Sequence, residues 1–444
     1  MSSTPVPARR RTELGLILLV VLLTGGLYAL AGFGKAGNLP ANIGPFLGII
    51  FALLLVAHLA MRRLAPNADP ILLPTAGLLN GIGYVFIARL SSHEARLQAV
   101  WTALGIASFV ATLLVVRRAR DLERYRYSFA FAGIVLLLLP LAPGIGEDIN
   151  GARLWIHVGS FNFQPGEIAK LALAVFFASV LVERGDLLSQ ATRRIGRFLV
   201  LDPRYLAPIL AAWGLSLLIF LSENDLGSSF LFFALFIGML WVATGRAYFL
   251  GLGAILFGFG SYLSLKVIGH AKTRVQGWLN PWAHASTSGY QLIQGWFAIA
   301  AGGLFGEGPG QSNASHIPEA STDLIFAVIA NELGLVGASA MLFGYLLMVG
   351  TGLRVALRCD RPFEKLLATG LSLIIGVQTF VIVGGVTRLI PLTGITLPFV
   401  SYGGSSLIAN YILLALLLRI SHDTESPPLL RDDAAGALIG QAAA

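Results

Sequence analysis

Long apolar runs recur throughout this 444-residue chain, and they limit what it can fold into more than any other feature. Twelve of them approach the roughly 20 residues that an α-helix needs to cross the hydrocarbon core of a bilayer. They lie near residues 14–33, 43–61, 71–88, 98–116, 127–141, 166–182, 206–221, 226–243, 248–268, 323–350, 364–386 and 397–418. Backbone polar groups inside a bilayer need internal partners, which favours helices as spanning elements. The sequence therefore predicts an all-α polytopic membrane protein with about 12 transmembrane helices.

Charged residues are scarce, and their distribution gives the helices an orientation. They make up 12% of the chain, about half the share found in soluble domains. With the N-terminus placed inside, the inner tails and loops hold 22 Lys and Arg residues and the outer loops hold 7. Cytoplasmic loops carry such an excess of positive charge, so we expect both termini in the cytoplasm. The net charge of +8 is then mainly an orientation signal, and we expect no nucleic-acid partner.

The chain divides into four predicted regions. They are a basic cytoplasmic N-terminus (1–12), two transmembrane helices (13–69), a helical core (70–420) and a disordered cytoplasmic tail (421–444). The largest segment expected outside the membrane is an outer loop near 269–322, which is rich in aromatic residues and glycine. A smaller outer loop precedes residue 166, and in it Arg153, Trp155 and His157 alternate as they would in a short amphipathic strand or an interfacial segment.

One stretch places acids where a membrane protein rarely has them. Residues 316–337 read HIPEASTDLIFAVIANELGLVG, so that Asp323 stands at the mouth of an apolar run and Glu332 lies within it. If a helix begins at Asp323, Glu332 lies roughly 13 Å deeper and on the opposite face. Ionisable groups at membrane depth are costly, which makes both acids candidates for function. Of the two we favour Asp323 for chemistry, and we expect Glu332 to hold helices together through a buried polar contact.

A second pair of charges lies at the start of the predicted helix 166–182. Pro165 takes the first-turn position that proline prefers, and Glu167 and Lys170 follow three residues apart, hence on one helix face. One interpretation is a local salt bridge at the membrane entrance. The other is a pair that serves a third charged group, because burying an ion pair in an apolar helix is rarely neutral.

The segment before the last predicted helix is interrupted. Residues 384–406 read GGVTRLIPLTGITLPFVSYGGSS, in which two prolines and a glycine pair break an apolar run. Broken backbone at membrane depth is tolerated where it lines a cavity or packs within protein. The candidates for lining a cavity are Glu319, Thr322, Ser401, Tyr402, Gly403, Gly404 and Ser405. Close helix packing is the alternative explanation for the glycines.

Six segments of the chain resemble, in the same order, the signature segments of one family. They are NGARLW, QPGEIAK, ENDLGS, GYQLIQ, IPEASTDLIFAVIANELG and GITLPFVSYGGSS. On these motifs, roughly residues 70–420 are identified as similar to the SEDS family (shape, elongation, division, sporulation), which includes the RodA and FtsW proteins. The segment GGVTRLIPLTG is more similar to the RodA proteins of actinobacteria than to FtsW.

The resemblance implies a function and a set of functional residues. SEDS proteins are peptidoglycan glycosyltransferases that polymerise lipid II at the outer face of the bacterial cytoplasmic membrane. They work with a class B penicillin-binding protein in the elongation or division machinery. The essential acid of the family falls on Asp323, and its paired Glu and Lys fall on Glu167 and Lys170.

The chain also departs from the family pattern. Gly166, Leu324 and Asn331 replace a Ser, a Phe and a Glu of the family motifs, and these changes leave the charged set intact. The family core has ten spans, so the two helices before residue 70 are an addition to it.

Our chemical hypothesis gives each charged group a role. Asp323 is the general base that takes the proton from the acceptor hydroxyl, with Lys170 and Glu167 in support of that carboxylate. A diphosphate leaving group needs charge neutralisation more than protonation, so one carboxylate suffices where glycoside hydrolases use two. The cations that are candidates for binding the diphosphate are Arg153, Lys272, Arg274 and Arg388. A divalent cation, Mg²⁺ or Mn²⁺, is left open as a cofactor, and no organic cofactor is expected.

Two other functions remain open at this stage. Many spans with polar interruptions also suit a lipid II flippase or transporter. Against it, the charged set concentrates at the predicted outer mouth and no internal repeat is apparent. A non-catalytic scaffold that recruits a partner through the outer loops is the third possibility.

Overall fold

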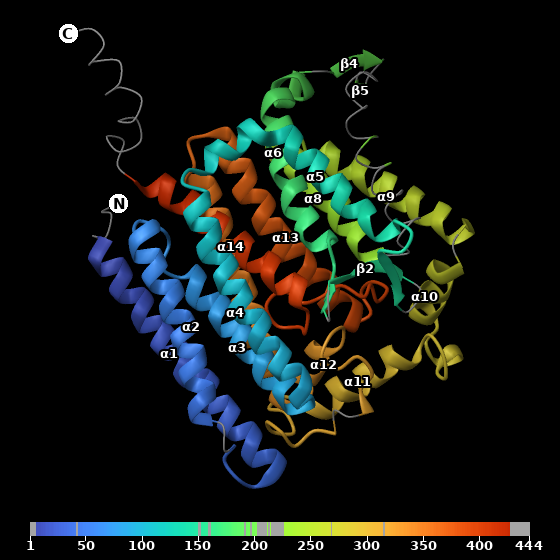
Figure 1. Cartoon of the computed structure of the whole chain (residues 1–444). Helices are drawn as coiled ribbons and strands as arrows, with labels where there is room; N and C mark the ends of the chain where they lie inside the picture. The colour runs from blue at the N-terminus through green and yellow to red at the C-terminus, as the bar shows by residue number, and fades with distance from the viewer. Residues whose placement is uncertain are drawn as a thin grey trace, which may run out of the picture.

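The computed structural model describes residues 6–40, 43–149, 152–158, 161–190, 192–195, 198–201, 211, 214, 226–267, 269–313 and 316–426. Within them the chain forms a bundle of helices (Figure 1). The α-helices are α1 (Val6–Ala36), α2 (Ile43–Leu64), α3 (Leu72–Leu90), α4 (Ser92–Val115), α5 (Arg126–Leu138), α6 (Gly166–Gln190), α8 (Leu226–Thr244), α9 (Tyr248–Val267), α10 (Gly269–Leu279), α11 (Tyr290–Gly302), α12 (Ile325–Arg358), α13 (Pro362–Val386) and α14 (Gly404–Glu425). Three short 3-10 helices are η1 (Ala119–Tyr125), η2 (Leu139–Leu141) and η3 (Trp282–His284).

Nine helical segments of this described part are long and apolar enough to cross a membrane, which confirms the predicted all-α polytopic architecture. They are Arg10–Ala36, Ile43–Leu64, Leu72–Leu90, Ser92–Val115, Ala119–Leu141, Gly227–Thr244, Ile325–Arg358, Pro362–Val386 and Gly404–Glu425. Of the other predicted spans, α6 covers 166–182, and a shorter apolar helix within α9 covers 248–263. The span predicted at 206–221 lies outside the described residues, apart from 211 and 214.

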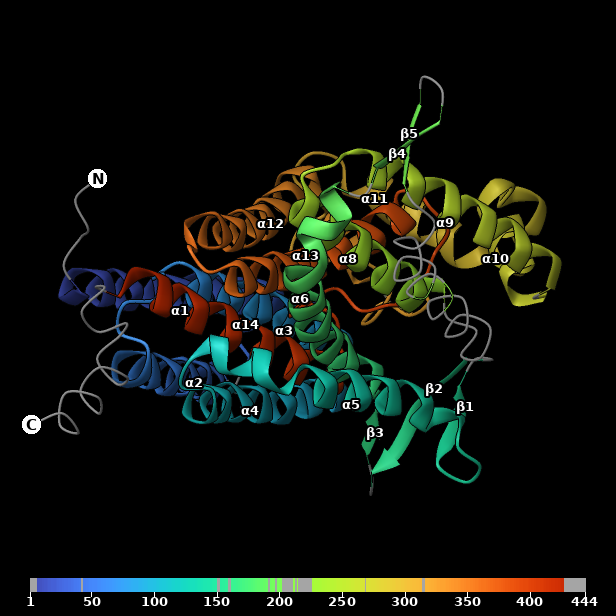
Figure 2. The ribbon, with the colours of Figure 1, turned by 90° about the horizontal axis from the view of Figure 1, so that it is seen from above.

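Short strands interrupt the helices in two places. β1 (Gly146–Ile149), β2 (Ala152–Val158) and β3 (Phe161–Phe163) form an antiparallel sheet in that order, which extends from the bundle beyond α5 (Figure 2). The alternating segment from Arg153 to His157 lies in β2, so the expected strand is confirmed. β4 (Thr192–Ile195) and β5 (Phe198–Leu201) form a separate hairpin.

Contacts of the two termini identify one end of the bundle. The start of α1 and the end of α14 both meet the connection between α2 and α3, because Arg10 donates to the Ala68 carbonyl and Asn67 Nδ2 donates to Ser426 Oγ over 3.0 Å. We call this the terminal end. The β1–β3 sheet, α10, α11 and the start of α12 lie toward the opposite end (Figure 1), which we call the loop end.

The long helix α12 is broken. Gly334 has a φ of 66°, in the region that glycine adopts most easily, and it separates the short half-helix 325–333 from the rest of α12. The loop 303–312 satisfies the backbone groups that the break exposes. Its hydrogen bonds are Glu307 N to Asn331 O (3.0 Å), Gly308 N to Glu332 O (3.1 Å), Leu335 N to Gly303 O (2.9 Å) and Val336 N to Leu304 O (3.1 Å). A broken helix is stable in an apolar environment when neighbouring backbone supplies these partners.

Candidate active site

Asp323 lies in a turn before α12 and not on the helix itself. The N–H groups of Thr322 and Leu324 both donate to the Glu319 carbonyl, over 3.2 and 3.1 Å, and Glu319 has a φ of 48°. This turn delays the helix until Ile325. The expectation that the helix begins at Asp323 is therefore wrong by two residues, and the expected depth difference between Asp323 and Glu332 stays a prediction. Glu332 lies near the far end of the half-helix 325–333, and the break at Gly334 follows it.

The loop before α14 holds this turn in place. Ser401 Oγ donates to the Thr322 carbonyl over 2.7 Å and accepts from the Leu397 N–H over 3.0 Å. The Tyr402 N–H donates to the Ser321 carbonyl over 2.8 Å. Two segments about 80 residues apart are thus joined beside Asp323. These bonds also explain why α14 begins at Gly404 and not near 397, because the preceding residues bond to the turn instead of to a helix.

A carboxylate and a guanidinium face the same space at this junction. A methyl group placed on Gly394 would lie 3.8 Å from Asp323 Oδ2 and 3.7 Å from Arg274 Nη2. Arg274 comes from α10. Its guanidinium is held beside Gly394 by a 3.0 Å hydrogen bond from Nη1 to the Thr393 carbonyl. Gly394 has a φ of 77°, so the position favours a residue without a side chain. The half-buried Asp323 and the Arg274 guanidinium therefore both lie close to Gly394.

Glu167 and Lys170 form a buried pair at the start of α6. Lys170 Nζ lies 2.5 Å from Glu167 Oε2 and donates to Gln378 Oε1 of α13 over 3.1 Å. The Lys170 side chain is 1% exposed. In the described part of the chain no ion pair joins Lys170 to Asp323, so any support of the carboxylate is indirect. Gln378 was not among the expected residues, although a lone amide in an apolar helix is a signal that sequence reasoning can use.

Three further cavity candidates, Ser405, Gly404 and Tyr402, lie at or just before the start of α14. Ser405 Oγ accepts the Gln164 N–H over 3.2 Å, which ties the entrance of α6 to the start of α14. A methyl group on Gly404 would overlap the Trp101 ring, so this glycine permits close packing against α4, the alternative considered for the glycine pair. Burial and the nearby Glu94 carboxylate raise the pKa of Tyr402, which keeps its hydroxyl protonated.

The other three candidate cations lie in different settings. Arg388 donates to the carbonyls of Trp278 and Leu279, over 3.1 and 2.8 Å, and lies over the Trp296 ring at 5.4 Å. It therefore joins the end of α10 to the connection between α13 and α14. Arg153 on β2 and Lys272 on α10 are exposed. Among the described residues, neither forms an ion pair with Asp323.

The second acid, Glu332, has the buried polar contact expected of it. Glu332 Oε1 lies 2.5 Å from Arg89 Nε of α3 and accepts from Ser312 Oγ over 2.7 Å. Glu332 Oε2 accepts the Gly310 N–H over 2.7 Å. The contact that was expected between helices thus also includes the loop 303–312. No group of three His, Cys, Asp or Glu side chains suited to a metal ion occurs in the part of the chain that the structure describes.

Comparison with known sequences decides the family. Residues 72–426 match the family of FtsW, RodA and SpoVE, described as cell cycle proteins. The chain belongs to this family. The peptidoglycan glycosyltransferase RodA of Mycobacterium tuberculosis is 41% identical over 435 residues, which cover 95% of this chain and 92% of the relative. RodA of Mycobacterium leprae is 42% identical over 433 residues, with the same coverage.

Other family members extend the comparison. A probable peptidoglycan glycosyltransferase FtsW of a Geobacter species is 37% identical over 375 residues, 81% of this chain and 98% of the relative. The crystal structure of RodA from Thermus thermophilus has a TM-score of 0.58 and 27% identity, and covers 81% of this chain and 98% of that one. A structure described as a peptidoglycan synthase complex that coordinates polymerization and crosslinking has a TM-score of 0.65 and 26% identity, with 80% and 98% coverage.

These similarities confirm the family inferred from the motifs. The family match begins at residue 72, at the start of α3, so α1 and α2 lie outside it. The mycobacterial RodA proteins cover 95% of this chain and therefore extend into these additional helices.

Proposed function

We propose that this protein joins lipid II units into glycan strands for cell elongation, with Asp323 as the general base. Its membership of a family whose relatives are named peptidoglycan glycosyltransferases supports the reaction class. The observation that carries the assignment of the base is the position of Asp323 and Arg274 around Gly394. A carboxylate that can accept a proton and a cation that can neutralise a leaving group are then available in one place.

The reaction follows from these two groups. Asp323 accepts the proton of the acceptor sugar's 4-hydroxyl, and the hydroxyl oxygen forms a bond to C1 of the donor sugar. The bond between C1 and the diphosphate oxygen breaks, and the polyprenyl diphosphate leaves with the electron pair. Arg274 neutralises part of the charge on that leaving group. Asp323 is the carboxylate that would hold a divalent cation here, with its other ligands from substrate and water, and the cation would supply further charge neutralisation to the leaving group.

In this proposal Lys170 and Glu167 are positioning residues. Their pair lies at the start of α6, and Gln164, the residue before Pro165, donates to Ser405 Oγ at the start of α14, next to the loop that holds the Asp323 turn. The pair therefore positions the loop and does not itself touch the reacting atoms.

The partner and location follow from the same reasoning. A solved neighbour is a complex that coordinates polymerization with crosslinking, which supports a class B penicillin-binding protein as the partner of this chain. The excess of Lys and Arg in the tails and inner loops supports a cytoplasmic location for both termini and an outer-face location for the loop end.

Polymerisation of purified lipid II tests the assignment of the base. We expect Asp323→Asn to lose detectable polymer while it keeps its fold and its binding of lipid II. A positioned base contributes about 10² to 10⁴ in rate, so the loss should be at least 100-fold. Asp121→Asn, which makes the same change at an exposed aspartate of η1, is the matched control and should polymerise normally.

Three outcomes would contradict the proposal. Near-normal polymerisation by Asp323→Asn would remove Asp323 as the base. Movement of lipid II across vesicles without polymer, in the presence of the cognate transpeptidase, would favour a transporter. Neither polymer nor movement under those conditions would favour a scaffold.

A further inference from the structure

The helices α1 and α2 have no counterpart in the family core, yet α1 reaches the loop that supports the half-helix 325–333. Gly34 of α1 packs directly on this loop, since a methyl group there would overlap the Pro309 carbonyl oxygen. A methyl group on Gly310 would in turn overlap the Ala31 carbonyl oxygen. The backbones of α1 and of the loop 303–312 are therefore in contact with no side chain between them.

The same region of the loop continues to Glu332. The Gly310 N–H and the Ser312 hydroxyl both donate to the Glu332 carboxylate, each over 2.7 Å. Arg89 completes the arrangement, because its side chain pairs with Glu332 at 2.5 Å while its carbonyl accepts from Lys35 Nζ of α1 over 2.7 Å. The end of α1 thus contacts both the loop and the arginine that hold Glu332.

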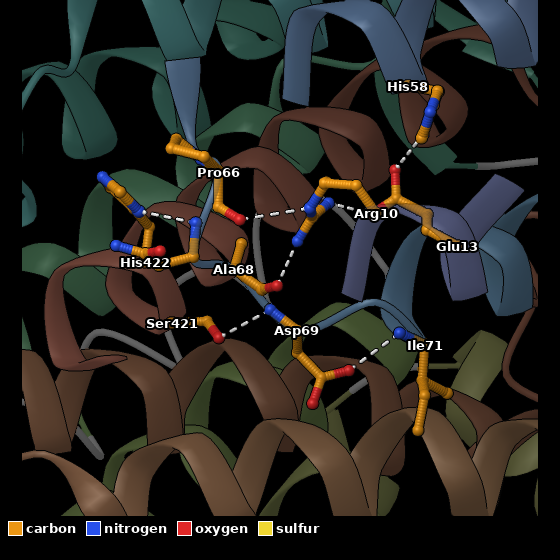
Figure 3. Close-up of polar contacts among 10 residues, drawn as sticks. Arg10, Glu13, His58, Pro66, Ala68, Asp69, Ile71, Ser421 and His422 are labelled. Carbon is orange, nitrogen blue, oxygen red and sulfur yellow. Dashed lines mark hydrogen bonds and ion pairs between the residues drawn. The ribbon is translucent and has the colours of Figure 1, made fainter. Parts of the chain in front are cut away.

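At the terminal end α1 is fixed by a buried polar cluster (Figure 3). Arg10 pairs with Glu13 and donates to the carbonyls of Pro66 and Ala68, and Glu13 Oε1 lies 2.7 Å from His58 Nδ1 of α2. The side chains of Arg10, Glu13 and His58 are all less than 6% exposed. Buried charges of this kind are costly to separate, so they fix the depth and rotation of α1.

The connection that receives Arg10 is also tied to the core. Asp69 N donates to Ser421 Oγ over 3.0 Å, and Asn67 N donates to His422 Nδ1 over 3.1 Å, both on α14 (Figure 3). With its first turns fixed to this connection and its last turn against the loop 303–312, α1 has little freedom to slide along its axis.

We propose that α1 is a positioning element for catalysis, which holds the half-helix 325–333 through the loop 303–312 and Glu332. The half-helix is bounded by the Asp323 turn at one end and by the Gly334 break at the other. A displacement at Glu332 is therefore carried along about two and a half helical turns to the turn that contains Asp323. This inference rests on the proposed role of Asp323 as the base.

Two glycines of α1 provide a matched test. Gly34→Leu and the smaller Gly34→Ala push α1 away from the Pro309 carbonyl, whereas a Cβ added by the same changes at the exposed Gly26 meets no atom within 4 Å. All four changes raise helix propensity, so loss of helix does not explain a difference between the two sites. Lipid II polymerisation by the full chain, with its transpeptidase partner, is measured as kcat and KM beside the unfolding temperature.

We expect Gly34→Leu to lower kcat about tenfold and Gly34→Ala to lower it less, with KM for lipid II unchanged within about twofold. A displacement of about 1 Å near the chemistry can cost 100-fold, and only part of it is transmitted here. Both Gly26 variants should match the wild type. If Gly34→Leu fails to fold, the comparison of the two alanine variants decides.

Equal kcat for folded Gly34 and Gly26 variants would overturn the inference, and so would a rise in KM at constant kcat, which indicates a binding defect. The two proposals fail separately. An inactive Asp323→Asn together with a normal Gly34→Leu would remove the positioning role alone, whereas an active Asp323→Asn would remove the base.

Discussion

Variants at the buried pair Glu167 and Lys170 on α6 test whether the pair serves folding alone or catalysis as well. In Lys170→Met the Glu167 carboxylate loses its partner at 2.5 Å, and Gln378 Oε1 loses its donor at 3.1 Å. The Glu167 side chain is 8% exposed, so water can replace little of this loss. Breaking such a pair from one side costs roughly 3–5 kcal/mol, and the amide adds about 1 kcal/mol. We expect the unfolding free energy of Lys170→Met to fall by about 4–6 kcal/mol, and polymerisation to fall with it.

The double variant Glu167→Leu with Lys170→Met is the informative one. Replacing both charges with apolar groups of similar size is often neutral or stabilising, so most of the lost stability should return. If the pair also positions the α14 loop, polymerisation should stay at least tenfold below the wild type although the fold is restored. The assay measures denaturant or thermal unfolding in detergent and lipid II polymerisation on the same samples. Full recovery of polymerisation in the double variant would show that the pair serves folding alone, and a double variant as unstable as the single one would refute the energetic reasoning.

Two further predictions concern packing and the loop end. Gly404→Ala should lower the unfolding temperature by several degrees, because its methyl group overlaps Trp101, whereas Gly166→Ala meets only one atom at 3.9 Å and should stay near the wild type in the same thermal scan. Arg388→Lys should lose most of the contact that Arg388 makes with the end of α10, because lysine cannot reproduce two donors in fixed geometry. Faster proteolysis of the segment 279–290 would show that this contact is lost.

Much of the helical architecture could be predicted from the sequence, because apolar runs of bilayer length leave few alternatives. The strand β2 also followed from its alternation. The boundaries that failed are those set by tertiary contacts. The run that begins at 397 is as apolar as its neighbours, but its first residues bond to the turn at 319–324. No local pattern indicates that Ser401 will donate to the Thr322 carbonyl, so the start of α14 could not be placed.

The sequence predicted which residues belong to the candidate site better than it predicted which of them contact each other. Glu332 was expected to make a buried polar contact, and its partner Arg89 could not be named because nothing in the sequence relates residues 243 positions apart. Arg274 and Arg388 were expected to act alike as cations of the outer loops. The structure separates them, because Arg274 faces the space beside Gly394 whereas Arg388 bonds carbonyls of α10.

The turn that delays α12 has a chemical consequence for Asp323. An aspartate is often found at the N-cap of a helix, where it accepts hydrogen bonds from the first helical N–H groups. Here the N-cap position falls on Leu324, whose side chain makes no capping bond, and Asp323 lies one residue earlier. Its Oδ2 is directed to the space shared with Arg274 beside Gly394. The loop before α14 on one side, and the loop 303–312 with α1 on the other, together fix this position. The half-helix therefore begins just after Asp323, whose Oδ2 lies near Arg274 beside Gly394.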